Sequence, residues 1–483
     1  MKGKLWTVLA VTVIFSLGLV ACAAPTPQVV EKQVVVEKPV VSTVVVEKEK
    51  VVEKPVVATV VVQKEVVVEK EVVVTATPVP PTPTPPPQPK VLYIGGTQSL
   101  TGAYAEDSAA VLAGFEDYAK YVNETKNLAP WRTEKFPADV TLEVLWRDDE
   151  LKPEKALSIY EELKAKGILV FRGSGSPQVL ALMDLLNEDR MGATTMAVGP
   201  YLLSPPRTFF IEYPIYTDAD AAIADWFMDQ WKAAGKTAKP RVAYLTADNA
   251  MGKSILIPEM QAYLEGIGYE FVGAQFVPLV PTAPPTTQLM WLKENKVDLA
   301  LGVMINPGAQ PTYKEMVRLD MGPDLGYKIT FGTASPGHAV VFAKAMGELG
   351  DGYVCAGSYP PLDDLTVPGI KFCNDLQTKY RPDKKVTHIM YAHGVVEAMI
   401  QVEALRLALA NTDKSADQLK PVDVLEYGFY MIKNLDTGGI TSTPLTFGPG
   451  KVYGIDKVLV QQVQKGKVVA LGTWPVHNIY KHE

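Results

Sequence analysis

IGGTQSLTGAYAEDSAAVLAGFEDYAKYVNE, residues 94–124, joins a short apolar segment to a long amphipathic one. The apolar segment begins at Lys90 and ends in glycine, which is typical of a buried strand. From Val111 to Val122 large apolar residues recur at steps of three and four, so the second segment is predicted to be a helix with one apolar face. Asp107 or Ser108 can cap this helix.

The same order of strand, loop and helix returns along the chain at residues 140–167, 168–189, 240–268 and 297–322, and a long late helix is expected over 388–410. Such regular alternation predicts an α/β fold, with doubly wound parallel sheets covered by helices on both faces. In these sheets ligands bind beyond the carboxyl ends of the strands. The functional residues are therefore expected in the strand-to-helix loops.

The N-terminus has the pattern of an export signal. Lys2 and Lys4 precede an apolar run over 5–19, which is shorter than the roughly 20 residues of a membrane span. The run ends in Leu-Val-Ala-Cys, which resembles the lipobox of bacterial lipoproteins. We expect residues 1–21 to be a cleaved signal peptide and Cys22 to be lipidated, which would anchor the protein to the membrane. An ordinary signal peptide that happens to end in cysteine is the alternative.

Residues 22–90 have the composition of a linker. Valine triplets alternate with Glu-Lys pairs, and residues 75–90 are dominated by proline. The charge pairs and prolines interrupt strand pairing between chains, and proline favours the extended polyproline II conformation. A disordered stalk is predicted here, and a small β-structured or self-associating repeat is the alternative.

The remaining residues, 91–483, include 37 basic and 46 acidic residues, a net charge of −9, which argues against a nucleic acid as partner. They contain no apolar run long enough to cross a membrane, so this body is expected to be soluble. Cys355 and Cys373 could form a disulfide in an oxidising compartment or remain as two buried thiols.

The loops contain no motif for catalysis or for a cofactor. They include neither a Gly-rich phosphate loop nor a dinucleotide fingerprint, and GSGSP at 173–177 does not have the spacing of a nucleophile elbow. His388 and His393 would stand roughly 140° apart on a helix, so they do not face one ion. With no zinc-type spacing of cysteine and histidine, we expect no metal, no cofactor and no enzymatic activity.

Taken together, these segments resemble the type I periplasmic binding proteins of ABC transporters, in particular the branched-chain amino acid and amide group. The likeness runs from Val91 to Val469 and rests on 94–124, 144–163 and 242–273, which stand in the order of that family. The resemblance implies two lobes that close on a ligand, joined by three hinge crossovers.

From the resemblance we place the crossovers near 212–216, 357–361 and 443–447. Lobe 1 would comprise residues 91–212 and 357–443, and lobe 2 residues 213–356 and 444–483, with a closing hairpin over 452–469. Closure would be driven by a ligand that contacts both lobes at once.

The resemblance also points to ligand-binding residues, carried over position by position. In lobe 1 these are Tyr104, Ser174, Gly175, Ser176, Ala197, Val198, Gly199 and Tyr391, and in lobe 2 Met251, Thr333 and Ala334. Gly175 lets the chain approach a ligand closely, and Pro177 suits a first helical turn. Gly199 stands where the family usually has a threonine that binds the ligand, so only backbone groups could serve there.

Residues 333–335 occupy the lobe 2 loop that often supplies an acid for an α-ammonium group, and this chain has no acid there. A buried ammonium without a counter-charge is costly, so a zwitterionic amino acid would need Asp148, Asp149 or Asp218 as a substitute. Amides, urea-like compounds, short carboxylates and aromatic acids suit the sequence equally well.

The sequence therefore predicts an exported, lipid-anchored solute receptor that passes a small polar molecule to a membrane permease of an ABC importer. A sensory or scaffold module on the same fold, signalling to a membrane partner, is the main alternative, because the fold alone does not separate the two. An exported enzyme is a more distant one.

Overall fold

The structure is a computed structural model and describes residues 90–334, 338–357 and 359–480. The predicted signal peptide, Cys22, Ser335 and the predicted stalk up to residue 89 lie outside the described residues. Within the described ranges, no helix combines the length and the apolar character needed to cross a membrane.

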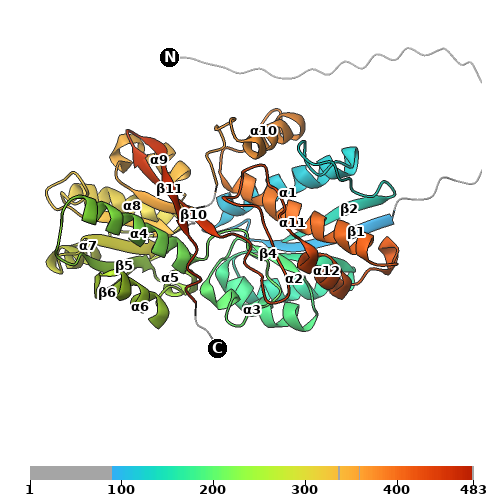
Figure 1. The fold of residues 1–483 in the computed structure, drawn as a ribbon, viewed down its shortest axis with the longest axis horizontal. Coiled ribbons are helices and arrows are strands. Elements are labelled where there is room, and N and C mark those ends of the chain that lie inside the picture. Colours follow the sequence, from blue (N-terminus) through green and yellow to red (C-terminus); the bar gives the residue numbers. More distant parts are fainter. Residues whose placement is uncertain (1–89, 335–337, 358, 481–483) are drawn as a thin grey trace, which may run out of the picture. The chain divides into compact units, whose positions relative to one another are not determined.

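Two sheets organise the described chain (Figure 1). The first is four-stranded and entirely parallel, in the order β2-β1-β3-β4. Its strands are β1 (Lys90–Gln98), β2 (Val140–Asp148), β3 (Ile168–Gly173) and β4 (Ala193–Thr195). Every residue of β3 is buried, as expected for a parallel strand covered on both faces. We call this sheet and the helices around it the first lobe.

The helices of the first lobe are α1 (Ala105–Thr125), α2 (Pro153–Ala165), α3 (Ser176–Glu188), α10 (Pro368–Tyr380), α11 (Met390–Asn411) and α12 (Pro421–Tyr427), with short 3-10 turns η1 (Pro200–Leu202), η3 (Ala416–Gln418) and η4 (Phe429–Met431). The predicted apolar face of α1, from Val111 to Val122, is buried. The prediction that Asp107 or Ser108 caps α1 is wrong, because the helix begins earlier, after Tyr104, and both residues lie in its first turns.

Helices α1 and α11 pack side by side at very short range (Figure 1). Two glycines make this approach possible. A Cβ atom at Gly114 would lie 2.0 Å from the carbonyl oxygen of Tyr391, and one at Gly394 would lie 2.0 Å from that of Val111. Any larger residue would push the two backbones apart. The close contact fixes the position of α11, which carries residues of the candidate site.

The second sheet is seven-stranded, in the order β11-β10-β9-β8-β7-β5-β6. Its parallel strands are β5 (Arg241–Ala247), β6 (Glu270–Val277), β7 (Leu299–Val303), β8 (Thr330–Ala334) and β9 (Val354–Gly357), and its antiparallel hairpin is β10 (Lys457–Gln464) and β11 (Lys467–Pro475). The predicted parallel sheets are thus confirmed in both lobes, with the late hairpin added at one edge of the second (Figure 1).

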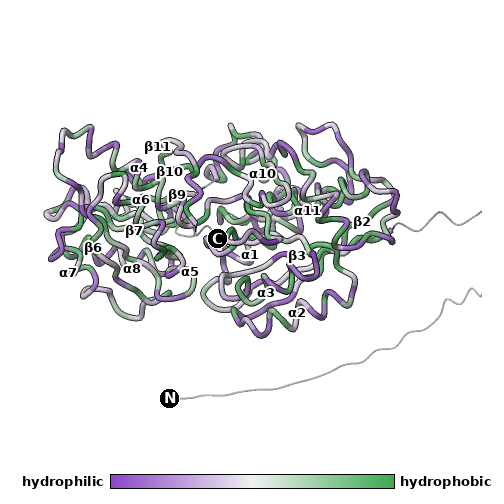
Figure 2. The backbone as a smooth tube through the Cα atoms, turned by 60° about the horizontal axis from the view of Figure 1, so that its bottom comes forward, coloured by the Kyte–Doolittle hydropathy of each residue, from purple (hydrophilic) through white to green (hydrophobic). Residues whose placement is uncertain are grey.

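The helices of this second lobe are α4 (Tyr216–Ala233), α5 (Ala250–Lys253), α6 (Pro258–Ile267), α7 (Thr286–Glu294), α8 (Asn306–Arg318) and α9 (Ala339–Met346), with the 3-10 turn η2 (Gly347–Gly350). Helix α4 packs against the central strands β7, β8 and β9. Figure 2 shows green, hydrophobic stretches inside both lobes and purple ones on many outer loops, which agrees with the burial of the central strands.

The chain passes between the two sheets after β4, after β9 and before β10. The first and third of these connections run side by side, since Ile211 N–H donates to Val452 O at 2.8 Å and Gly454 N–H donates to Ile211 O at 2.8 Å. Neighbouring connections of this kind are the segments at which two lobes can hinge.

Both described cysteines are free and buried, Cys355 in β9 and Cys373 in α10. Of the two alternatives drawn from the sequence, the structure has the pair of buried thiols rather than the disulfide. Burial raises the pKa of the Cys355 thiol to about 12, which disfavours the reactive thiolate.

Candidate functional site

A small cavity lies where loops of the two lobes face each other. Its lining comes from Tyr104, Asp107, Gly175, Ser176, Met196, Ala197, Met390 and His393 of the first lobe, from Met251, Ile305 and His338 of the second, and from Tyr213 and Tyr216 of the first connection. The cavity is therefore shared by both sheets.

The positions of the lining residues follow from the strand order. Gly175 and Ala197 come directly after β3 and β4, while Met251, Ile305 and His338 follow β5, β7 and β8. The carboxyl ends of parallel strands are where open α/β sheets bind ligands, so the site lies where the sequence predicts it.

The cavity is small in this structure, with a volume of about 20 Å³. That is room for one water-sized group. Wider depressions, of about 450 Å³ beside Tyr453 and about 610 Å³ beside Lys344, are open to the surface and are not lined by the loops that follow β3, β5 and β7. A ligand of more than a few atoms therefore enters the smaller cavity only when the lobes part or the lining methionines change rotamer.

Tyr104 and Met251 close the cavity from opposite lobes. The Tyr104 hydroxyl donates to Met251 Sδ at 3.6 Å, and both side chains are buried. The Tyr104 ring also lies against Gly175, where a Cβ atom would be only 2.7 Å from the ring. A larger residue at position 175, just before helix α3, would therefore clash with the Tyr104 ring.

Some residues predicted to bind ligand line the cavity and others do not. Those that line it are Tyr104, Gly175, Ser176, Ala197 and Met251. Ser174 lies behind it, where its hydroxyl donates to the Asp149 carboxylate, and Asp149 also accepts from Ser99 Oγ at 2.7 Å. The side chain of Ser174 is thus engaged away from the cavity.

The other predicted residues also lie outside the lining. Val198 is buried and its carbonyl accepts from Tyr216 N at 3.0 Å, while Gly199 precedes η1. Thr333 and Ala334 end strand β8, and the Thr333 hydroxyl bonds to Tyr353. Tyr391 is in the core of the first lobe.

Tyr391 illustrates why a helix position alone does not identify a site residue. It is 0% exposed, and its hydroxyl donates to Asp117 Oδ2 at 2.9 Å. The same Asp117 oxygen accepts from Arg381 Nε at 2.7 Å. The tyrosine therefore joins α11 to α1 inside the first lobe.

The acids considered as ammonium partners are used elsewhere. Asp148 accepts from the backbone N–H groups of Leu100 and Glu150, both at 2.9 Å. Asp218 accepts from those of His477 at 3.2 Å and Ile479 at 3.1 Å. Neither of them lines the cavity, and Asp149 does not either.

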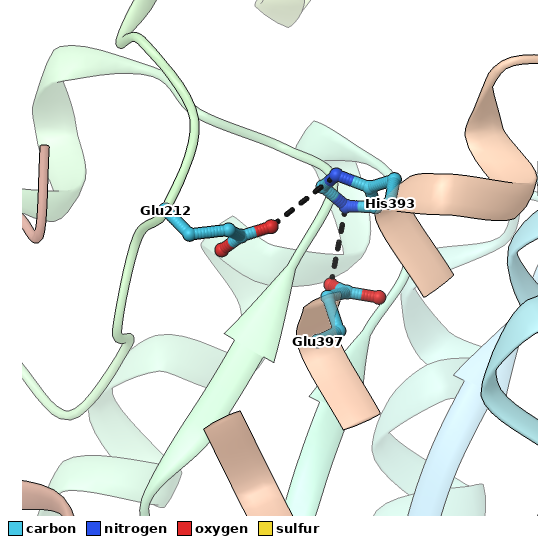
Figure 3. Close-up of side chains that lie close together, drawn as sticks. All are labelled: Glu212, His393 and Glu397. Carbon is cyan, nitrogen blue, oxygen red and sulfur yellow. Dashed lines mark ion pairs between the residues drawn. The ribbon is translucent and has the colours of Figure 1, made fainter. Parts of the chain in front are cut away.

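A network of buried charges reaches the cavity through His393 (Figure 3). His393 Nδ1 lies 3.2 Å from Glu212 Oε1, and its Nε2 lies 3.3 Å from Glu397 Oε1. The other Glu397 oxygen accepts from Arg172 Nε at 2.8 Å. These four residues, which we call the His393 network, are all 0% exposed.

The charges of the His393 network cancel only when His393 is protonated and Glu212 is ionised. Burial acts to lower the pKa of His393, but the carboxylates of Glu397 and Glu212 together raise it above its ordinary value. Burial also acts to raise the pKa of Glu397, which Arg172 and His393 hold below its usual range. Burial raises the pKa of Glu212 to about 7, so Glu212 takes part in the proton equilibrium of the network near neutral pH. The network keeps Arg172 and His393 as cations beside the Glu397 carboxylate, because a buried charge needs a partner.

Glu212, His393 and Glu397 also bring their ligand atoms within 4.8 Å of one another, a grouping that could hold a metal ion. His393 and Glu397 are four residues apart on α11, but Glu212 is distant in the chain, so the search for zinc spacing of cysteine and histidine did not foresee the grouping. Arg172 already pairs with Glu397, and its positive charge opposes a divalent cation at this point. The arrangement suits a bound proton on His393 better than a metal.

A second titratable group lines the cavity at Asp107. Asp107 Oδ1 lies 3.2 Å from His388 Nε2 and 3.6 Å from His338 Nε2. His388 precedes α11 in the first lobe, whereas His338 precedes α9 in the second, and the two rings meet edge to face at 5.6 Å. We call these three residues the Asp107 cluster, which bridges the lobes.

Both histidines of the Asp107 cluster are neutral near pH 7. Burial, with a smaller effect of Lys344, lowers the pKa of His388 to about 4. Burial also lowers the pKa of His338 well below its ordinary value. Burial, with a smaller effect of the like charge on Glu106, raises the pKa of Asp107 to about 7, and the positive charge of His393 opposes this rise only in part.

Sequence reasoning missed several lining residues, among them Asp107, His338 and His393. Asp107 was interpreted as a helix cap, and His338 stands just beyond the loop searched for an acid. His388 and His393 were judged as a pair on one helix, but α11 begins at Met390, after His388. The available signal was the position of His338 shortly after the apolar segment that forms β8, since a ligand-facing residue is expected beyond the carboxyl end of a strand.

Comparison with known proteins places this geometry in a family. Residues 91–465 match the model of a family described as periplasmic binding protein. The chain therefore belongs to the periplasmic binding protein family, whose members bind solutes rather than catalyse reactions. A search of curated proteins found no match to the sequence.

Solved structures share the fold at low sequence identity. A branched-chain amino acid ABC transporter protein from Thermus thermophilus, solved with bound valine, is 19% identical with a TM-score of 0.67, covering 81% of this chain and 97% of that one. A fatty acid ABC transporter substrate-binding protein from Thermomonospora curvata is 20% identical with a TM-score of 0.63, covering 81% and 94%.

A solute-binding protein of an ABC transporter from Rhodopseudomonas palustris BisB5, solved with 3,4-dihydroxybenzoic acid, is 17% identical with a TM-score of 0.62. That alignment covers 80% of this chain and 98% of the other. At such identities the likeness establishes the fold and leaves the ligand open.

Proposed function

We propose that this chain is an extracytoplasmic solute-binding lipoprotein of an ABC importer. It closes over a small polar ligand such as an amino acid, an amide or a carboxylate, and delivers the ligand to the membrane permease. Membership of the periplasmic binding protein family supports this proposal at the general level.

The observation that carries the proposal is the shared cavity. Its lining comes from loops at the carboxyl ends of strands in both sheets, and connections between the sheets run beside it. A ligand held there contacts both lobes at once, so its binding energy favours the closed form. A ligand that touched a single lobe would have no such effect, and a permease could not distinguish the loaded protein from the empty one.

The lining also limits the ligand. Tyr104, Tyr213 and Tyr216 provide aromatic surface, and Met196, Met251 and Met390 provide unbranched apolar side chains that adapt their shape. Polar side chains stand among these apolar surfaces, namely Asp107, Ser176, His338 and His393, and such groups orient a ligand. Proteins of the same fold have been solved with valine and with an aromatic acid, which supports a small organic ligand here too.

The N-terminal pattern supports export and anchoring. The apolar run before Cys22 and the linker up to residue 90 would tether the body to the outer face of the cell membrane. Mass spectrometry of the mature protein tests this directly. We expect a lipid-modified Cys22 at the N-terminus, and an unmodified cysteine or a retained signal would contradict the anchor.

Ligand binding is tested by thermal shift and calorimetry on the full chain in detergent, with a panel of amino acids, amides and carboxylates. A ligand at a hundred times its dissociation constant adds about 2.7 kcal/mol to stability, which is readily measured. Failure of every compound to bind would overturn the proposal. Uptake of the labelled ligand, lost on deletion of the gene, would separate import from the sensory alternative.

A further inference from the structure

Asp107 is the sole carboxylic acid among the described residues that line the cavity. Its residue is 7% exposed, and Oδ1 is buried 3.2 Å from His388 Nε2 without a well-aligned hydrogen bond in the described part of the chain. Although Asp107 lies in the first turn of α1, its side chain does not cap that helix, whose N-cap is Tyr104. The carboxylate is thus not explained by the local structure.

The two histidines that contact Asp107 do not supply a positive charge. His388 Nδ1 accepts from Met390 N–H at 3.3 Å, so the ring proton is on Nε2, which faces Asp107. This tautomer is a neutral hydrogen-bond donor. His338, on the opposite lobe, is also buried and has no hydrogen-bond partner at Nε2 within the described residues. An ionised Asp107 is therefore a buried charge between two neutral imidazoles.

Charged groups on the surrounding elements are engaged or exposed. On the same helix, Glu106 is exposed and carries a like charge. Lys344 of α9 is directed to the Thr387 hydroxyl at 2.8 Å, and Arg381 pairs with Asp117 at 2.7 Å. The protonated His393 favours the charged form of Asp107 as a smaller effect, but it is not among the ion-pair partners of Asp107 in the described residues. Within the described part of the chain, no cation on these elements therefore pairs directly with Asp107.

We propose that Asp107 is the counter-ion for an ammonium group of the ligand, so that the cavity selects amine-bearing solutes over their deaminated analogues. This inference rests on the proposed solute-binding function. It assigns to the first lobe the acid that the loop over Thr333 and Ala334 of the second does not provide. His338 then covers the ammonium group from the second lobe, which couples recognition to closure.

The dimensions agree with this assignment. The cavity that Asp107 lines has a volume of about 20 Å³, room for one water-sized group, which is the size of an ammonium head. The lining also contains Gly175 and Ser176 at the start of α3, where free amides favour a negative group. An amine-bearing acid would therefore place its ammonium group at Asp107 and its carboxylate at the start of α3.

The test uses calorimetry on the full chain with matched sets of probes. Leucine is compared with isocaproate, which lacks the ammonium group, and with isoamylamine, which lacks the carboxylate. The sets valine, isovalerate and isobutylamine, and phenylalanine, hydrocinnamate and phenethylamine, vary the side chain, and acetamide and urea represent neutral ligands. We expect the amine-bearing member of the best set to bind at least tenfold more tightly than its deaminated analogue.

Two variants test whether the preference for amine-bearing probes depends on Asp107. Asp107→Asn should weaken the amine-bearing probe at least tenfold and leave the deaminated analogue within about twofold. Glu106→Gln removes the same charge from the neighbouring exposed position and should change neither. Because Asp107→Asn removes an unpaired buried charge, the variant should fold with an unfolding temperature at or above that of the parent.

The outcomes distinguish failure of the ammonium assignment from failure of the solute-binding function. Tightest binding of a deaminated acid or a neutral amide, or an amine-bearing probe whose affinity survives Asp107→Asn, would overturn the ammonium assignment and leave the solute-binding function intact. A panel in which no probe binds would count against the solute-binding function itself.

Discussion

His393 and Asp107 both line the cavity from the first lobe, yet their charges are held in opposite ways. His393 stands between the carboxyl groups of Glu212 and Glu397, and Arg172 forms an ion pair with Glu397. Asp107 has two imidazoles as its ion-pair partners in the described residues, and burial lowers the pKa of each imidazole. The His393 network therefore has its ionic partners without a ligand, whereas Asp107 contacts no cation in the described residues.

This difference in charge pairing distinguishes a group that holds the fold from one that recognises a ligand. A buried network of paired charges fixes the geometry of the elements that contribute to it. For the His393 network these elements are β3, the first connection and α11. A buried acid without a counter-charge has an energetic cost, which a proton or a cationic ligand relieves. We therefore attribute a structural role to the His393 network and a ligand-directed role to the Asp107 cluster.

The largest expected change in the free energy of unfolding comes from breaking the His393 network. Arg172→Met keeps the length and removes the charge, leaving Glu397 buried with His393 alone. Breaking a buried ion pair in this way costs about 3–5 kcal/mol. Urea unfolding of the variant and the parent measures the loss.

Arg190→Met is the matched control, because Arg190 pairs with Glu426 at 2.5 Å on the surface, where both side chains are nearly half exposed. Such exposed pairs contribute about 0–1 kcal/mol. If the two variants lost equal stability, the His393 network would have no special structural role.

The next effect concerns the pH dependence of Asp107. Its pKa is raised from 3.8 to about 7, so between these values the native state holds a proton that the unfolded state has lost. Stability relative to Asp107→Asn should then fall as pH rises from about 4 to about 7 and stay level above that. At about 1.4 kcal/mol for each tenfold change in the proton equilibrium, the fall is at most about 4 kcal/mol.

His393 provides the contrast in the same titration. Because its pKa is raised in the folded state, its contribution is fully present below its ordinary value of 6.5 and is lost only as pH rises through the folded pKa. The Asp107 window should therefore precede that of His393. A difference curve between the parent and Asp107→Asn that is flat from pH 4 to 7 would show that Asp107 is not an isolated buried acid.

The fold was accessible from sequence because its signals are local. The strand at Lys90–Gln98 and the helix after Tyr104 are encoded by apolar spacing within a few residues, and the rule for carboxyl ends then indicates which loops carry the site. The helix boundary was placed too late, because the cap was sought among Asp107 and Ser108 and the structure has no side-chain cap.

The electrostatics of the site were not accessible in the same way. Arg172 and Glu397 are 225 residues apart, so their pairing depends on how α11 packs against the first sheet. Ser174 and Ser176 are nearly adjacent, yet Ser176 lines the cavity and Ser174 bonds to Asp149 behind it. Neither distinction leaves a spacing or composition signal in the sequence.

A smaller effect is expected at the glycine contact that sets both groups in place. Gly394→Ala would put a Cβ atom 2.0 Å from the Val111 carbonyl, so α11 must move away from α1. Overpacking of this kind costs about 1–3 kcal/mol. Since α1 carries Asp107 and α11 carries His393, the change should disturb both groups together.

Gly266→Ala is the control for that substitution, because Gly266 lies in helix α6 with no atom near the added Cβ. Alanine there should stabilise the protein by about 0.5–1 kcal/mol. Thermal unfolding of the two variants gives the comparison, and a stabilising Gly394→Ala would show that the close approach of α1 and α11 is not required.

The smallest effect should come from Tyr104→Phe, which removes the hydroxyl that reaches Met251 across the cavity at 3.6 Å. A hydrogen bond to a thioether sulfur is weak, and the ring keeps its packing against Gly175. We expect a loss below about 1 kcal/mol in urea unfolding. Tyr104→Ala should cost several times more, because it empties the space that the ring fills between the lobes. Equal losses for the two variants would mean that the hydroxyl rather than the ring holds the lobes together, and that closure is directed by polar contacts at Tyr104 as well as by the Asp107 cluster.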